Sequence, residues 1–194
     1  MNTKHETWRV FCAFGLPPEV RMRLIEHMAQ LRNLFPQVRA SWNRDENIHL
    51  TLKFLGETPV ERVSKLDEAI SRAVVGLEPF PIVISGTGVF PRPRDPRVLW
   101  IGVSDATGSL AKVQSRLEHE SEQEGFPKEV RQFHPHLTVA RLRTQQRARE
   151  LAQAHLDLKF ASEEILVTEL LLIRSELSSQ GSRYTTISRH QLKG

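Results

Sequence analysis

Two short segments of the sequence combine histidine and threonine at the same spacing, His49-Leu50-Thr51-Leu52 and His136-Leu137-Thr138-Val139. Each segment contains, in order, a histidine, an apolar residue, a threonine and an apolar residue. Side chains of an extended strand alternate between its two faces, so each histidine shares a face with its threonine and the apolar residues occupy the other. One face of such a strand packs, and the other presents an imidazole and a hydroxyl.

A pair of imidazoles suits acid-base catalysis near neutral pH. The unperturbed pKa of histidine is about 6.5, so one ring can hold a proton while the other lacks one. When a cyclic phosphodiester opens, one histidine takes a proton from water and the other protonates the departing alkoxide, each contributing about 10² to 10⁴ in rate. Hydroxyl groups can donate hydrogen bonds to the charged phosphate oxygens. We therefore predict His49 and His136 as the catalytic pair and Thr51 and Thr138 as phosphate-binding residues.

Chance and metal binding are the alternatives to a catalytic pair. One His-x-Thr in a strand is common by chance, whereas two copies with the same apolar alternation favour a functional pair. His134-Pro135-His136 offers two imidazoles to a metal, but no cluster of Cys, Asp or Glu accompanies them, so we expect no metal. The remaining histidines lie near the termini or in predicted helices, without a partner pattern. We predict them at the surface: His5, His27, His119, His155 and His190.

The strand of the first motif continues with the same alternation. Leu50, Leu52 and Phe54 are predicted to be buried. Lys53 is predicted on the opposite face, beside His49 and Thr51.

Hydrophobic periodicity predicts a series of strands and helices around the two motifs. Strands are expected at 8–16, 38–42, 48–55, 80–90, 98–103, 133–142, 158–160, 165–175 and 182–189. Helices are expected at 19–35, 60–75, 108–124 and 145–155. This order fits an α+β fold made of two similar halves. The motif histidines are 136 − 49 = 87 residues apart, so duplicated halves would place one His-Thr pair on each wall of a cleft between two sheets.

Composition is that of an ordinary globular protein. The chain has 194 residues, a net charge of +4 and a sequence pI near 9.6, which permits anionic partners without identifying them. A single cysteine, Cys12, allows no internal disulfide and is predicted to be a packed thiol. Residues 1–9 form no apolar signal core, and no run approaches the roughly 18 apolar residues of a membrane span. We expect one compact domain, residues 1–194, in the cytoplasm.

Arginines and aromatic residues could extend the site. Arg141 suits bidentate phosphate binding, but strict alternation places it opposite His136, so it reaches the cleft only if the strand ends or bulges. The segment 91–97 holds three prolines and three arginines and is predicted to be an exposed loop. Arg92, Arg94 and Arg97 either follow an RNA backbone or simply favour solubility.

Two aromatic residues flank the predicted cleft strands. Trp42 and Phe90 either stack on a base or pack in the core.

With its flanks 47–56 and 135–141, the motif pair resembles the two-histidine (2H) phosphoesterase superfamily. It is most similar to the RNA 2',3'-cyclic phosphodiesterases (ThpR/LigT), also called 2'-5' RNA ligases. The segments 88–91, 97–100 and 170–184 resemble the same family. The resemblance implies a bilobal fold with pseudo-twofold symmetry, two antiparallel sheets facing a central cleft, helices on the outside, and no metal or other cofactor.

The resemblance also implies an activity. The family hydrolyses RNA 2',3'-cyclic phosphate ends to 2'-phosphates and can join tRNA halves by ATP-independent 2'-5' ligation. Its first histidine is usually drawn as the proton donor and its second as the base, and His134 stands where relatives often carry a basic residue. The sequence contains no phosphate-binding loop of the Gly-x-x-x-x-Gly-Lys-Ser/Thr type, and this absence argues against an ATP-driven ligase.

Two other functions remain open. One is hydrolysis of small cyclic nucleotides or of 2'-5' oligonucleotides by the same histidines, and the other is a non-catalytic nucleotide- or RNA-binding module. We expect RNA or a nucleotide as the partner, no membrane, and a monomer.

Overall fold

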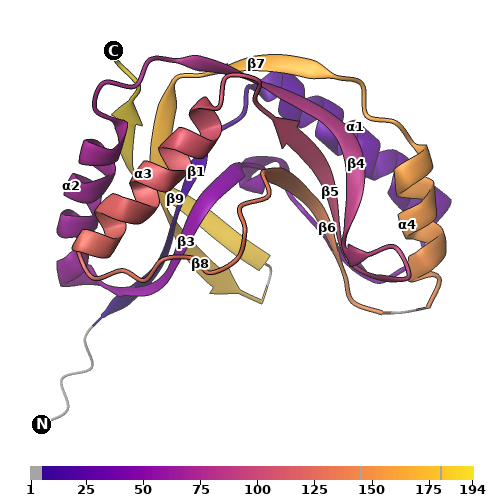
Figure 1. Ribbon diagram of the computed structural model, residues 1–194. Coiled ribbons are helices and arrows are strands. Elements are labelled where there is room, and N and C mark those ends of the chain that lie inside the picture. Colours follow the sequence, from indigo (N-terminus) through magenta and orange to yellow (C-terminus); the bar gives the residue numbers. More distant parts are fainter. Residues whose placement is uncertain (1–5, 145, 180) are drawn as a thin grey trace, which may run out of the picture.

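The computed structural model describes residues 6–144, 146–179 and 181–194, which form two antiparallel sheets with helices outside them (Figure 1). The four-stranded sheet has the order β3 (Leu50–Pro59), β1 (Thr7–Phe14), β8 (Glu169–Ser178) and β9 (Gly181–Gln191). The five-stranded sheet has the order β2 (Ala40–Trp42), β6 (His136–Leu142), β5 (Asp95–Ser104), β4 (Phe80–Arg92) and β7 (Glu163–Val167). The predicted α+β fold with two antiparallel sheets is confirmed.

Two helices cover the outer side of each sheet. The four-stranded sheet carries α2 (Val63–Val74) and α3 (Ser109–Gln123), and the five-stranded sheet carries α1 (Pro18–Leu34) and α4 (Ala148–Asp157). Two short 3-10 turns, η1 (Asp45–Asn47) and η2 (Val60–Arg62), precede β3 and α2. The helices form where apolar residues recur at helical spacing, and α2 buries Val63, Leu66 and Ile70 on one face.

The two sheets are interleaved along the chain. Strand β1 belongs to the four-stranded sheet, whereas the helix that follows it, α1, covers the five-stranded sheet. Strands β7 and β8 are consecutive but lie in different sheets. The motif strands β3 and β6 are edge or near-edge strands of their sheets and contact each other where the sheets meet. This arrangement brings the two motifs into one region; a single domain spanning 1–194 remains a prediction.

Apolar side chains pack on both faces of the four-stranded sheet. One continuous core lies between the helices and the faces of both sheets that the helices cover. A second, small cluster of Phe11, Ala13, Leu171 and Ile173, with Tyr184 against it, lies on the other face of the four-stranded sheet. Cys12 is fully buried, as predicted, and burial raises the pKa of its thiol.

Three predicted elements differ from the structure. No strand forms at 158–160, since these residues pair with no strand. The apolar residue that suggested one, Phe160, is buried by side-chain packing alone. The predicted strand 165–175 is two strands separated at Thr168, where the chain passes from one sheet to the other. The segment 91–97 is the tip of the β4-β5 hairpin rather than a loop, with Pro91 opposite Pro96. The predicted helix start at Gln145 lies outside the described residues.

Within those residues, each helix is too short or too polar to cross a membrane.

Candidate active site

A β-bulge follows the threonine of the first motif. Ala13 of β1 pairs with Thr51 and Cys12 pairs with Lys53, so Leu52 is the extra residue of β3. A bulge turns two successive side chains toward the same face of the sheet. Both Leu52 and Lys53 are accordingly buried on the helix side. The prediction that Lys53 lies beside His49 is therefore wrong.

The second motif carries the same bulge at the same position. Trp100 of β5 pairs with Thr138 and Leu99 pairs with Ala140, which leaves Val139 as the extra residue of β6. Val139 and Ala140 are both fully buried. The backbone of the two motifs is thus duplicated beyond the four residues that define them.

Each bulge returns the next side chain to the face of the histidine. Phe54 is 59% exposed, so its predicted burial is wrong, and its ring lies 5.9 Å from that of Phe11. Arg141 occupies the equivalent position after the second bulge and is exposed. Arg141 shares the face of His136 if the strand bulges between them, and the structure has this bulge.

His49 is half-buried between two aromatic rings. Phe11 stacks on it at 4.7 Å between ring centroids, and Tyr184 meets it edge-on at 5.3 Å. Burial lowers the pKa of His49 from 6.5 to about 4, and a hydrogen bond to the Asn47 backbone partly opposes this change. The ring is therefore neutral at neutral pH in the absence of a bound anion.

His136 also lies between two aromatic rings and hydrogen-bonds to the backbone. Phe90 lies edge-on at 5.0 Å and Trp100 at 6.2 Å between ring centroids. Nδ1 of His136 hydrogen-bonds to the carbonyl oxygen of His134 at 2.7 Å. Burial is the largest cause lowering the pKa of His136, and the positive charge of Arg141 lowers it further.

Both rings hydrogen-bond to the backbone two residues upstream, His49 to Asn47 and His136 to His134. A carbonyl oxygen only accepts hydrogen bonds, so Nδ1 of His136 carries the proton there. In the neutral ring Nε2 is then the acceptor, and in the protonated ring it is a donor. His136 is thus preset to exchange a proton through Nε2, as a general base or acid must.

Residues 43–49 link β2 of one sheet to β3 of the other, and they hydrogen-bond to the second motif and to β9. The side chain of Asn43 donates to the Thr138 carbonyl oxygen at 2.7 Å, and its backbone N–H donates to the Val139 carbonyl. The side chain of Asn47 donates to the Ser182 carbonyl oxygen at 2.9 Å. These two asparagines tie the approach to His49 to strands β6 and β9.

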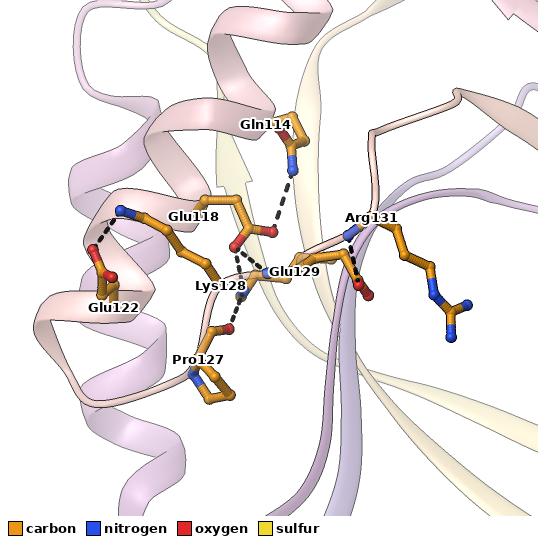
Figure 2. A network of polar contacts seen from close by, with 8 residues as sticks. Gln114, Glu118, Glu122, Pro127, Lys128, Glu129 and Arg131 are labelled. Atoms are coloured by element: carbon orange, nitrogen blue, oxygen red, sulfur yellow. Dashed lines mark hydrogen bonds and ion pairs between the residues drawn. The ribbon is translucent and has the colours of Figure 1, made fainter.

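A buried ion pair supports the first bulge from behind. Nζ of Lys53 lies 2.5 Å from Oε2 of Glu118 on α3 and donates to the Pro127 carbonyl oxygen at 2.8 Å. Figure 2 shows Glu118 as the centre of this network, which also receives the Glu129 backbone N–H and the Gln114 amide. The network joins β3 to the segment between α3 and β6. The network therefore anchors the bulge of the first motif to the segment that leads from α3 toward β6.

A cavity of about 380 Å³ opens beside His49. Tyr184, Thr186 and Arg189 of β9 line one side, and Arg21 of α1 lines another. Its size and mixed lining suit a small polar ligand such as a nucleoside.

The other predicted site residues divide into two groups. Phe90 and His134 lie near His136, with the Phe90 and His134 ring centroids 6.5 Å apart. Trp42 instead packs partly buried against the core, which favours its structural alternative. The three hairpin arginines, Arg92, Arg94 and Arg97, are exposed at the tip of β4 and β5. Over 6–144, 146–179 and 181–194 no three His, Cys, Asp or Glu side chains gather in a metal-binding group.

Three of the histidines predicted at the surface are buried instead. Nε2 of His27 lies 3.0 Å from Nδ1 of His155, and Nε2 of His155 lies 3.0 Å from the Trp100 carbonyl oxygen. Since that carbonyl must accept, His155 donates to it and receives the His27 N–H. Burial lowers the pKa of His27 to about 4.

His190 is the third buried histidine, and it pairs with Asp67 at 2.9 Å. His119 is exposed as predicted. His5 lies outside the described residues.

Sequence reasoning missed the residues that pack on the motif histidines. Phe11 and Tyr184 contact His49, and Trp100 contacts His136. Each alternates regularly along its own strand, but only the pairing of strands shows that it faces a histidine. Asn43 and Asn47 lie between the predicted strands 38–42 and 48–55, and polar residues between strands carry no signal of their partners.

Comparison with known proteins agrees with the fold and with the family that the sequence resembles. The family model of the 2'-5' RNA ligase superfamily matches residues 16–178. An RNA 2',3'-cyclic phosphodiesterase of Thermotoga maritima is 32% identical over 187 residues, 96% of each chain. That of Archaeoglobus fulgidus is 35% identical over 179 residues, 91% of this chain and 96% of the relative.

Solved structures give the same result. The crystal structure of E. coli LigT complexed with 3'-AMP superposes with a TM-score of 0.77 at 26% identity, covering 97% of this chain and 100% of that one. TT0787 of Thermus thermophilus gives a TM-score of 0.79 at 28% identity, covering 96% and 98%. The chain belongs to the 2'-5' RNA ligase superfamily.

Proposed function

We propose that this protein hydrolyses the 2',3'-cyclic phosphate end of RNA to a 2'-phosphate. The observation that carries the proposal is the duplication of one catalytic device, a histidine and a threonine before a bulge with the ring bonded to the backbone two residues upstream. Relatives named RNA 2',3'-cyclic phosphodiesterase support the substrate class.

The reaction needs one base and one acid. Water attacks phosphorus as the base takes its proton, the bond from phosphorus to the 3' oxygen breaks, and the acid protonates that oxygen. The positive charge of Arg141 disfavours a second cation on His136, which supports His136 as the base. Burial lowers the pKa of His49, and the negative charge of a bound phosphate opposes this shift, which favours protonation of His49 as the acid.

The remaining side chains of the site stabilise charge. Thr51 and Thr138 donate hydrogen bonds to the phosphate oxygens, and Arg141 adds a bidentate cation. If the 5' hydroxyl of a second RNA replaces water as the nucleophile, the same steps give a 2'-5' linkage without ATP. We also propose that the protein acts in the cytoplasm as a monomer.

Small cyclic nucleotides are a second candidate substrate. The cavity beside His49, about 380 Å³ in volume, is large enough for one nucleoside, and such a substrate would use the same histidines.

Product analysis tests the proposal. With a chelator present, an RNA that ends in a 2',3'-cyclic phosphate is expected to yield a 2'-phosphate. His49→Ala and His136→Ala are each expected to lower kcat at least about a hundredfold. His119→Ala, an exposed histidine on α3, is the matched control and is expected to keep the wild-type rate. A 3'-phosphate product, loss of activity with chelator, or normal turnover by both histidine variants would refute the proposal.

A further inference from the structure

The tip of the β4-β5 hairpin and the start of α4 form a second, basic pocket. Arg92, Arg94 and Arg97 of the hairpin and Arg149 of α4 line it, and Asp95 is the one acidic residue among its lining residues. The pocket has a volume of about 670 Å³, and all four arginines are exposed. Four guanidinium groups against one carboxylate make this pocket a site of positive potential.

The hairpin holds these cations together. Nε of Arg149 donates to the Arg94 carbonyl oxygen at 2.8 Å, which joins α4 to the hairpin tip. Arg97 lies 3.4 Å from Asp95. Prolines 91, 93 and 96 restrict the backbone between them, so the arginines protrude from a stiff support.

Strand register places the pocket in line with the second motif. On β5, Trp100 pairs with Thr138, Val98 pairs with Arg141, and Asp95 pairs with Arg92. At about 3.3 Å per residue, the tip lies roughly 16 Å beyond the level of Thr138.

The hairpin tip also continues the strands that hold the residues around His136. Arg92 is only two residues beyond Phe90 along β4, and the Phe90 ring contacts His136. A row of cations thus follows the strands from Arg141, opposite Val98, to Arg92, opposite Asp95.

The substrate chemistry gives this row a direction. A 2',3'-cyclic phosphate closes the 3' end of an RNA, so the rest of the chain extends only in the 5' direction. Its upstream phosphates each carry a negative charge, and guanidinium groups bind them without reading the sequence.

We propose that the pocket of Arg92, Arg94, Arg97 and Arg149 binds backbone phosphates upstream of the reactive end. This inference rests on the proposed function and goes beyond it, because it makes an RNA chain the preferred substrate over a mononucleotide.

The test compares two substrates with the same terminal base, an RNA oligonucleotide and a mononucleoside, each ending in a 2',3'-cyclic phosphate. In the Arg94→Ala/Arg149→Ala variant, the ratio of kcat/KM for RNA to kcat/KM for the mononucleoside is expected to fall about tenfold, the effect of one lost charge-assisted hydrogen bond. Arg94→Glu keeps the carbonyl that Arg149 binds and is expected to lower the ratio at least as much. Arg32→Ala, an exposed arginine on α1, is the matched control and leaves the ratio unchanged.

Salt dependence gives a second readout. The slope of log(kcat/KM) for RNA against log salt concentration is expected to become shallower by roughly 0.7 for each phosphate that the variant no longer binds. A ratio and a slope that stay at the wild-type values in both hairpin variants would overturn the inference while leaving the proposed function intact.

Binding separates this inference from the proposed function. If the wild type turned over neither substrate, the proposed function would fail, and fluorescence anisotropy with the 2'-phosphate-terminated RNA would still test the pocket. Binding that is about tenfold weaker in Arg94→Ala/Arg149→Ala than in Arg32→Ala supports the inference, and equal binding overturns it.

Discussion

The two motif strands share one backbone design but differ in the side chains that follow the bulge. Where the first motif buries Lys53 behind the sheet and turns Phe54 to the cleft face, the second buries Ala140 and turns Arg141 to that face. The charged residue of the first half, Lys53, therefore supports the strand from behind. The charged residue of the second half, Arg141, lies on the face of the site. Duplicated geometry thus supplies two equivalent histidines, and the residues after the bulges make their environments different.

The largest expected effect is a loss of stability caused by a change in the first half. Lys53→Ala leaves Glu118 as an uncompensated buried charge and is expected to lower the free energy of unfolding by about 3 to 5 kcal/mol. Chemical denaturation measures this loss. The double variant Lys53→Met/Glu118→Leu removes both charges and is expected to recover most of the stability. A Lys53→Ala protein as stable as the wild type would show that the pair does not support the first bulge.

The second effect comes from the five-stranded half. Because burial lowers the pKa of His27 from 6.5 to about 4, the unfolded chain binds more protons between these values, and acid favours unfolding. The free energy of unfolding is therefore expected to be unaffected by His27 above pH 6.5. It is expected to fall by about 3 kcal/mol as the pH falls toward 4.

Denaturation at several pH values checks this prediction. His27→Gln keeps a donor for His155 but does not titrate, so its stability is expected to depend less on pH over this range. An unchanged pH dependence would contradict the assigned role of the buried pair.

The smallest effect compares the two residues that follow the bulges. Arg141→Ala is expected to lower kcat/KM by roughly ten- to a hundredfold, because it removes charge-assisted hydrogen bonds to phosphate worth about 1.5 to 3 kcal/mol. It is also expected to raise the pKa of His136, which the pH profile of kcat/KM reports. Phe54→Ala is the matched change in the other half and is expected to affect kcat/KM less. Equal losses in the two variants would remove the functional difference between the halves.

The sequence predicted the alternation within each motif because it is local. His49 with Thr51 and His136 with Thr138 follow from the period of two alone. The bulges were not predictable, since they appear only as a register shift against β1 and β5. The consequences for Lys53 and Phe54 were therefore missed.

Longer-range features were also beyond local reasoning. The chain leaves one sheet for the other at Thr168 in the middle of an apolar run, with no proline or glycine to mark the break. His27 and His155 are 128 residues apart, and each alone has the pattern of a surface helix residue. Their burial follows from the packing of α1 and α4 on the same sheet.

The central claim, that the two motifs form one catalytic site, is tested most directly by combining His49→Ala and His136→Ala. We measure kcat/KM on an RNA with a 2',3'-cyclic phosphate end for each single variant and for the double variant. If the histidines act as a unit, each single change costs at least about a hundredfold and the double change costs little more than the worse single change. Single variants that each keep about half of the wild-type rate would instead show two independent sites and contradict the account.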